Sequence, residues 1–102
     1  MVSVKCSDLH FVFSVAPRVT SRQCSSPVLE GDDVTLECNA TGNPVPSIGW
    51  IMESTGIVVS NNSILILSNI NRNASGVYQC IAMNSIGNDT KNCTVDVYCK
   101  FT

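Results

Sequence analysis

Strict alternation of apolar and polar residues marks two segments of the chain as half-buried β-strands. The alternation runs over residues 33–40, and again over residues 77–83 with Tyr78, Cys80 and Ala82 on one face. Successive side chains of a strand point to opposite faces, so this pattern places one face against a core. In the first segment the inward face is formed by Val34, Leu36, Cys38 and Ala40.

Shorter apolar segments predict the remaining strands, at residues 47–52, 57–59, 64–67 and 90–98. Leu65 and Leu67 are expected to point inward. Glycine, proline and polar residues predict loops at 42–46 and 71–75 and a hairpin turn at 87–89. No segment has the periodicity of an amphipathic helix. Short strands separated by turns are typical of an all-β sandwich or barrel.

Six cysteines among 102 residues indicate an oxidising compartment. None forms a C-x-x-C pair and His10 is the only histidine, so a metal site or other cofactor is not expected. Disulfide bonds are the better interpretation.

The charges exclude several classes of function. Charged residues make up 14% of the chain, the net charge is −2, and the lysines and arginines are scattered. Without a basic stripe, binding to nucleic acid or to an anionic membrane is not expected. No apolar run reaches the roughly 18 residues that a membrane span needs, so direct membrane insertion is not expected either. Residues 1–16 are interpreted as a leader or linker, with a degraded signal sequence as one possibility.

Several motifs occur in a fixed order along the chain: LEGDDVTLEC at 29–38, GNPVP at 42–46, Trp50, LILSNI at 65–70, GVYQC at 76–80 and AMNSIG at 82–87. In this order and spacing, the chain resembles an immunoglobulin superfamily domain of the intermediate (I) set, as found in adhesion molecules and receptor ectodomains. The resemblance implies a two-sheet antiparallel Greek-key sandwich of about seven to eight strands over residues 17–99, followed by the start of a linker at 100–102.

The resemblance also implies roles for the core residues. Cys38 and Cys80 are expected to form the disulfide that joins the two sheets, with Trp50 packed on it. The Tyr78 hydroxyl is expected to bond back to the backbone, and Leu36 and Leu67 to lie in the core.

The other four cysteines admit several pairings. In this family the segment after Cys24 runs parallel to the last strand, which contains Cys93, so a Cys24–Cys93 bridge is expected. Three alternatives remain for Cys6 and Cys99: they bridge each other, they pair with another domain, or they stay free.

Five Asn-x-Ser/Thr sequons agree with passage through the secretory pathway. Strand alternation places Asn39 and Asn92 on outward faces, and the turn pattern places the other three in loops. We expect two to four of the five to carry sugar: Asn39, Asn61, Asn73, Asn88 and Asn92.

The sequence holds no arrangement typical of an enzyme. His10 lies outside the predicted fold, and Asp32 and Asp33 point to opposite sides of a strand. The expected function is therefore extracellular protein recognition in cell adhesion or receptor–ligand binding, with a homophilic or heterophilic protein partner. The alternatives are part of a growth-factor receptor kinase ectodomain, or a structural spacer of the muscle-filament kind. Val45 and Ile86, apolar residues on polar loops, are the predicted docking residues.

Overall fold

The computed structural model describes residues 14–24 and 27–99, and most of them lie in β-strands. The strands are β1 (Val15–Gln23), β2 (Val28–Leu29), β3 (Val34–Asn43), β4 (Ser47–Met52), β5 (Ile57–Ser60), β6 (Ile64–Leu67), β7 (Gly76–Met83), β8 (Asn88–Val95) and β9 (Val97–Tyr98). One turn of 3-10 helix spans Arg72–Ala74.

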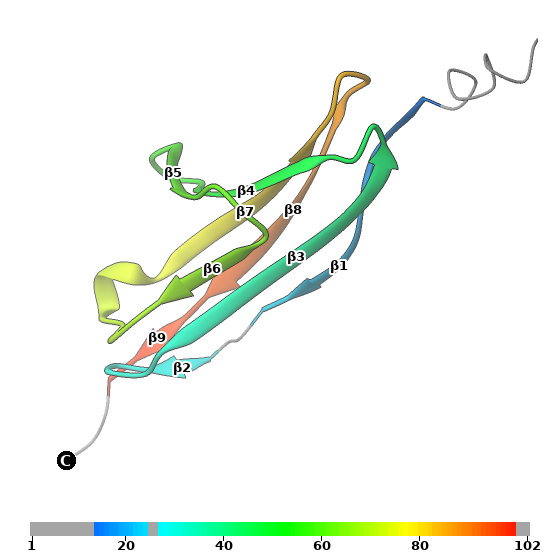
Figure 1. Cartoon of the computed structure of the whole chain (residues 1–102). Coiled ribbons are helices and arrows are strands. Elements are labelled where there is room, and N and C mark those ends of the chain that lie inside the picture. The colour runs from blue at the N-terminus through cyan, green and yellow to red at the C-terminus, as the bar shows by residue number, and fades with distance from the viewer. Residues whose placement is uncertain (1–13, 25–26, 100–102) are drawn as a thin grey trace, which may run out of the picture.

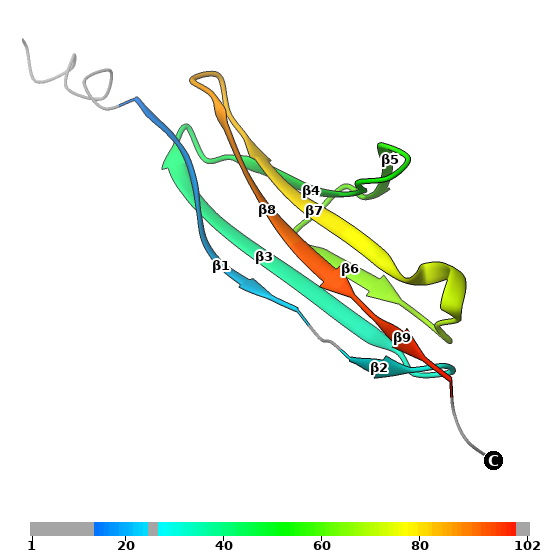
Figure 2. The same ribbon diagram turned by 180° about the vertical axis from the view of Figure 1, so that it is seen from behind.

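The strands form a sandwich of two antiparallel sheets, which confirms the predicted all-β fold (Figure 1). One sheet has the order β1-β3-β6 and the other the order β5-β4-β7-β8, while β2 and β9 make a short parallel pair. Seen from behind, β2 and β9 lie at the end of the sandwich opposite the β7–β8 turn (Figure 2).

The core lies between the two sheets and is apolar throughout the described residues. Trp50, Tyr78 and Leu36 are its largest fully buried side chains, and Leu67 is half-buried against them. Burying a side chain of this size contributes roughly 1.5–3 kcal/mol each. The inward residues that alternation selects in β3 and β7 therefore supply much of the driving force for folding.

Strand β1 is a feature that the sequence analysis did not expect. It begins at Val15, inside the segment assigned to a leader, and pairs with β3 from Val15↔Asn43 to Gln23↔Glu37. This ladder carries β3 beyond the predicted end at Ala40 into the segment assigned to a loop. The remainder of the predicted leader, including Cys6 and His10, lies outside the described residues, as do residues 100–102.

The second half of the chain differs from the prediction in three places. Asn88 and Asp89 begin β8, because the hairpin reverses earlier, with the Asn84 N–H bonded to the Gly87 carbonyl at 3.0 Å. The predicted last strand is divided at Asp96, whose carbonyl accepts a hydrogen bond from Val28 N–H at 2.9 Å. The chain leaves the β7 ladder there and pairs with β2, which brings the described strands to nine. The predicted loop at 71–75 contains the 3-10 turn.

Candidate functional site

The outer face of the β5-β4-β7-β8 sheet carries a hollow with a largely apolar lining. Trp50 and Cys80 point into the core, so their neighbours along β4 and β7 point outward. The outward partners face each other across the ladder, as Gly49↔Ile81 and Ser47↔Met83. On the other side of β4, Ile51 pairs with Val58 of β5.

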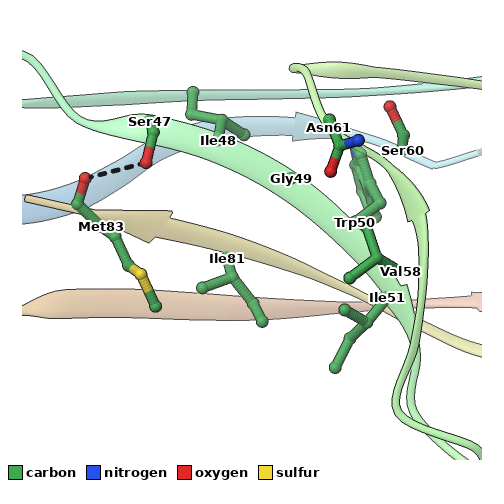
Figure 3. Close-up of a pocket in the computed structure, with 10 residues that line it drawn as sticks. All are labelled: Ser47, Ile48, Gly49, Trp50, Ile51, Val58, Ser60, Asn61, Ile81 and Met83. Atoms are coloured by element: carbon green, nitrogen blue, oxygen red, sulfur yellow. Dashed lines mark hydrogen bonds between the residues drawn. The ribbon is translucent and has the colours of Figure 1, made fainter.

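A hollow of about 290 Å³ opens on this face. Figure 3 shows the side chains that surround it. Its lining residues are Ser47, Ile48, Gly49, Trp50, Ile51, Val58, Ser60, Asn61, Ile81 and Met83. The hollow therefore has an apolar floor and no charged side chain in its lining.

Gly49 makes the depth of the hollow possible. It sits at the centre of β4, and a Cβ atom at this position would lie 3.1 Å from the Ser60 carbonyl oxygen. A larger residue would both fill the hollow and press against β5. Val58 and Met83 lie at the rim of the hollow, with 57% and 50% of their surface exposed.

The turn between β5 and β6 forms one wall of the hollow and is held by polar contacts. The Ser60 hydroxyl donates to the Ile64 carbonyl at 2.7 Å, and the Asn62 side chain accepts from Ile64 N–H at 2.9 Å. The Trp50 indole N–H donates to the Ser63 carbonyl at 3.0 Å. The turn is thus anchored both to itself and to the core.

The two predicted docking residues lie elsewhere, at the end of the sandwich. Val45 is 87% exposed and Ile86 is 51% exposed. Asn84 connects their loops, because its side-chain amide donates to the Pro44 carbonyl at 2.9 Å and its oxygen accepts from Ile86 N–H at 2.8 Å. Both side chains are therefore presented by ordered backbone.

Sequence reasoning missed the face of the sheet. Ile51, Ile81 and Met83 occupy outward positions of β4 and β7, and a strand with apolar residues on both faces was the available signal. That signal does not distinguish a covered strand from one whose outer face binds a partner.

Two disulfide bonds join the sheets. Cys38 pairs with Cys80 (Cα–Cα 6.4 Å) beside Trp50, and Cys24 pairs with Cys93 (Cα–Cα 5.8 Å). The second bridge connects the end of β1 to β8. Cys99 is free and exposed.

All five sequon asparagines are exposed, but they lie on different parts of the surface. Asn39 is on β3 in the opposite sheet, and Asn73 is in the 3-10 turn. Asn61 lines the hollow. Asn92 and Asn88 are on β8, which corrects the expectation that Asn88 lies in a loop.

Two titratable groups have pKa values shifted by their surroundings. The hydrogen bond from Val19 N–H has the largest effect on Asp89 and lowers its pKa. Burial raises this pKa by a smaller amount, while Thr90 N–H, Lys91 and Arg18 lower it further. Burial raises the pKa of Tyr78, whose hydroxyl donates to the Ala74 carbonyl at 2.7 Å. This contact is the tyrosine corner of the sandwich.

The described residues show neither a metal site nor a membrane span. No group of three or more His, Cys, Asp or Glu side chains within ranges 14–24 and 27–99 could hold a metal ion. Over the same ranges, no helix is long and apolar enough to cross a membrane.

The family model described as "Immunoglobulin domain" matches residues 16–84. The chain belongs to this family. A human relative, Immunoglobulin superfamily member 10, is 32% identical over 98 residues, which cover 87% of this chain and 4% of the relative. Interference hedgehog of Drosophila grimshawi is 33% identical over 88 residues, covering 80% of this chain and 10% of the relative.

A third curated relative is a titin homologue. The titin homologue of Caenorhabditis elegans is 31% identical over 93 residues, which cover 81% of this chain and, to the nearest per cent, 0% of the relative. The immunoglobulin domain thus spans a tenth or less of the length of these relatives.

Solved structures show the same fold. The first two domains of DIP-gamma match with a TM-score of 0.75 and 31% identity, covering 83% of this chain and 49% of that one. Dpr2 Ig1-Ig2 in complex with DIP-Theta Ig1-Ig3 matches with a TM-score of 0.69 and 32% identity, covering 83% and 33%. The further assignment to the I set stays a prediction.

Proposed function

We propose that this immunoglobulin domain is an extracellular protein-recognition module of a larger cell-surface protein, acting in adhesion or in receptor–ligand binding. The observation that carries the proposal is the uncharged apolar hollow on the outer face of the β5-β4-β7-β8 sheet. Exposed apolar patches rimmed by polar groups mark interaction sites more often than isolated exposed residues do.

The composition of this face supports a protein partner. The centres of protein interfaces are depleted of charge and enriched in methionine and aromatic residues. Here Ile51, Ile81 and Met83 surround the hollow, and Ser47 and Ser60 supply polar groups at its rim.

The cysteines and sequons support the extracellular setting. Two disulfides persist in oxidising compartments, and five exposed sequons suit the secretory pathway. The relatives named Interference hedgehog and DIP-gamma, and the solved DIP–Dpr complex, also support a recognition role. A receptor kinase ectodomain remains compatible with the same features.

The similarity to a titin homologue supports one other candidate, a structural spacer. The two functions differ in compartment and in binding. Cultured animal cells should secrete the full-length protein with both disulfides formed, and the purified domain, displayed as a tetramer, should bind an ectodomain of a cell-surface protein. Retention in the cytosol with reduced cysteines would favour the spacer and contradict the proposal.

A further inference from the structure

We propose that the edge of β4 at Ile48 binds an extended, uncharged segment of the protein partner. The segment adds to the sheet as a further strand where β5 ends, and one of its apolar side chains enters the hollow. This inference rests on the proposed function for the existence of a protein partner, and it names the way in which that partner binds.

One side of β4 is only partly covered by a neighbouring strand. Strand β7 pairs with β4 along its whole length. Strand β5 covers the opposite side only as far as Trp50, which pairs with Ser60. In the part of the chain that the structure describes, no strand pairs with β4 on that side at Ser47, Ile48 or Gly49. The edge of the sheet is therefore open over these residues.

The backbone of Ile48 faces the open side. In an antiparallel sheet, the hydrogen-bonding groups of successive residues alternate between the two neighbouring strands. The Glu53 N–H donates to the Val77 carbonyl at 2.9 Å, on the β7 side. The Met52 carbonyl accepts from Gly56 N–H at 2.8 Å, on the β5 side. Ile48, four residues before Met52, therefore directs its N–H and its carbonyl beyond the end of β5, where no described strand meets them.

The hollow reaches this open edge. Ile48 packs against the core, whereas Ile81 pairs with Gly49 on the outer face, yet all three line the hollow. Figure 3 shows Ile48 and Asn61 on one side of the β4 ribbon and Ile81 on the other. The volume of about 290 Å³ is at the lower limit of small-molecule pockets, roughly 300 Å³, so the hollow suits one side chain better than a whole ligand. A strand along the edge supplies such a side chain.

The residues around this edge carry no charge. Sheet edges in natural proteins are often protected from further pairing by lysines and other charged side chains. Neither β4 nor the segment between Glu53 and Arg72 contains a charged residue. An uncharged segment therefore fits this edge, because a charged one would lose hydration without gaining an opposite charge.

Strand addition explains how a short edge and a small hollow can act together. Backbone hydrogen bonds supply affinity in this mode of recognition, and a pocket for a side chain supplies specificity. The N–H and carbonyl of Ile48 offer two such bonds. Pro46 has no N–H, so the open edge is short, and an isolated peptide should bind with a Kd on the order of 1 mM.

The test uses a short peptide and two variants of one residue. The peptide acetyl-Ser-Leu-Ser-Leu-Ser-amide is uncharged, and its control carries a methyl group on every backbone nitrogen, which removes the N–H donors and keeps the leucines. Ile48→Pro removes the N–H at the open edge without removing a ladder bond, whereas Ile48→Val keeps it. The full 102-residue chain is refolded oxidatively from bacteria, which add no sugar to Asn61, and binding is followed by NMR of its backbone amides.

We expect the peptide to move the amide signals of Ile48 and Gly49. The methylated peptide should bind the unmodified chain about tenfold more weakly, because it leaves the Ile48 carbonyl without a donor. Ile48→Pro should weaken binding of the first peptide to a similar extent, and Ile48→Val should not. Equal binding of the two peptides, or unmoved signals at Ile48, would overturn the inference even if the proline variant did not fold.

Failure of this inference can be distinguished from failure of the proposed function. If the displayed tetramer binds a cell-surface ectodomain, and folded Ile48→Pro binds it as well as Ile48→Val does, strand addition is wrong and the proposed function stands. If the peptides behave as expected but the tetramer binds no ectodomain, the strand-binding edge is confirmed and recognition of a cell-surface protein is contradicted.

Discussion

The carboxylate of Asp89 on β8 accepts a hydrogen bond from the backbone N–H of Val19 on β1, with 2.7 Å between nitrogen and oxygen. The two strands belong to different sheets and form no ladder with each other. The contact therefore ties the edges of the sandwich together, in the same region where Cys24 and Cys93 are bridged.

This relationship predicts a dependence of stability on pH. Because the Val19 N–H stabilises the ionised carboxylate, the pKa of Asp89 is lower in the folded chain than in the unfolded chain. Its contribution is present above the unfolded value of about 3.9 and is lost as the pH falls through the folded value. Asp89→Asn keeps an oxygen acceptor and the Asn88 sequon but removes the titration. Below about pH 5, the melting temperature of the unmodified chain should fall more steeply than that of the variant. If the melting temperatures of the two proteins fall equally with pH, Asp89 contributes nothing to the loss of stability in acid.

The two disulfides should contribute differently to the free energy of unfolding. Loop closure over separations of 42 and 69 residues gives each bridge about 4 kcal/mol in the chain-entropy model. Cys38 and Cys80 are both fully buried, whereas in the other bridge Cys93 is buried and Cys24 only half-buried, so removing the core bridge leaves the larger cavity. Replacing both by alanine should cost more than replacing Cys24 and Cys93, as measured by urea unfolding. A larger loss from the Cys24–Cys93 pair would contradict the central role of the core bridge.

Loss of the tyrosine-corner hydrogen bond should reduce the free energy of unfolding by less than loss of a disulfide. Tyr78→Phe removes the hydroxyl that donates to the Ala74 carbonyl, which should reduce stability by about 1 kcal/mol. Tyr98→Phe is the matched control, because Tyr98 is 55% exposed. Denaturant unfolding of both variants measures the difference. Equal stabilities would mean that the corner hydrogen bond has no net effect.

Local pattern was sufficient to predict most of the sandwich but not its non-local parts. The alternation in β3 and β7 reports which side chains face the core, and it can be read from the sequence because burial acts residue by residue. Strand β1 depends on a ladder with β3, and the break at Asp96 depends on pairing with β2. Neither leaves a clear local pattern.

The candidate site was harder to predict for the same reason. Val45 stands out in sequence as an apolar residue in a polar loop, and it is exposed as expected from that position. The hollow arises only because β5 folds back beside Gly49 and brings Val58 next to Ile51. A surface formed by three strands cannot be recognised from any one of them.

The affinity of outer-face variants for the partner tests the central claim most directly. Ile81→Asp places a charge in the hollow and should weaken binding by about tenfold or more, since truncating a central interface residue costs over 1–2 kcal/mol. Ile66→Asp makes the same change at a 64% exposed position of the other sheet and should leave the affinity unchanged. Melting temperatures of both variants establish that they are folded. If Ile81→Asp binds normally while Val45→Asp or Ile86→Asp loses binding, the partner docks at the end of the sandwich, and the assignment to the sheet face is wrong.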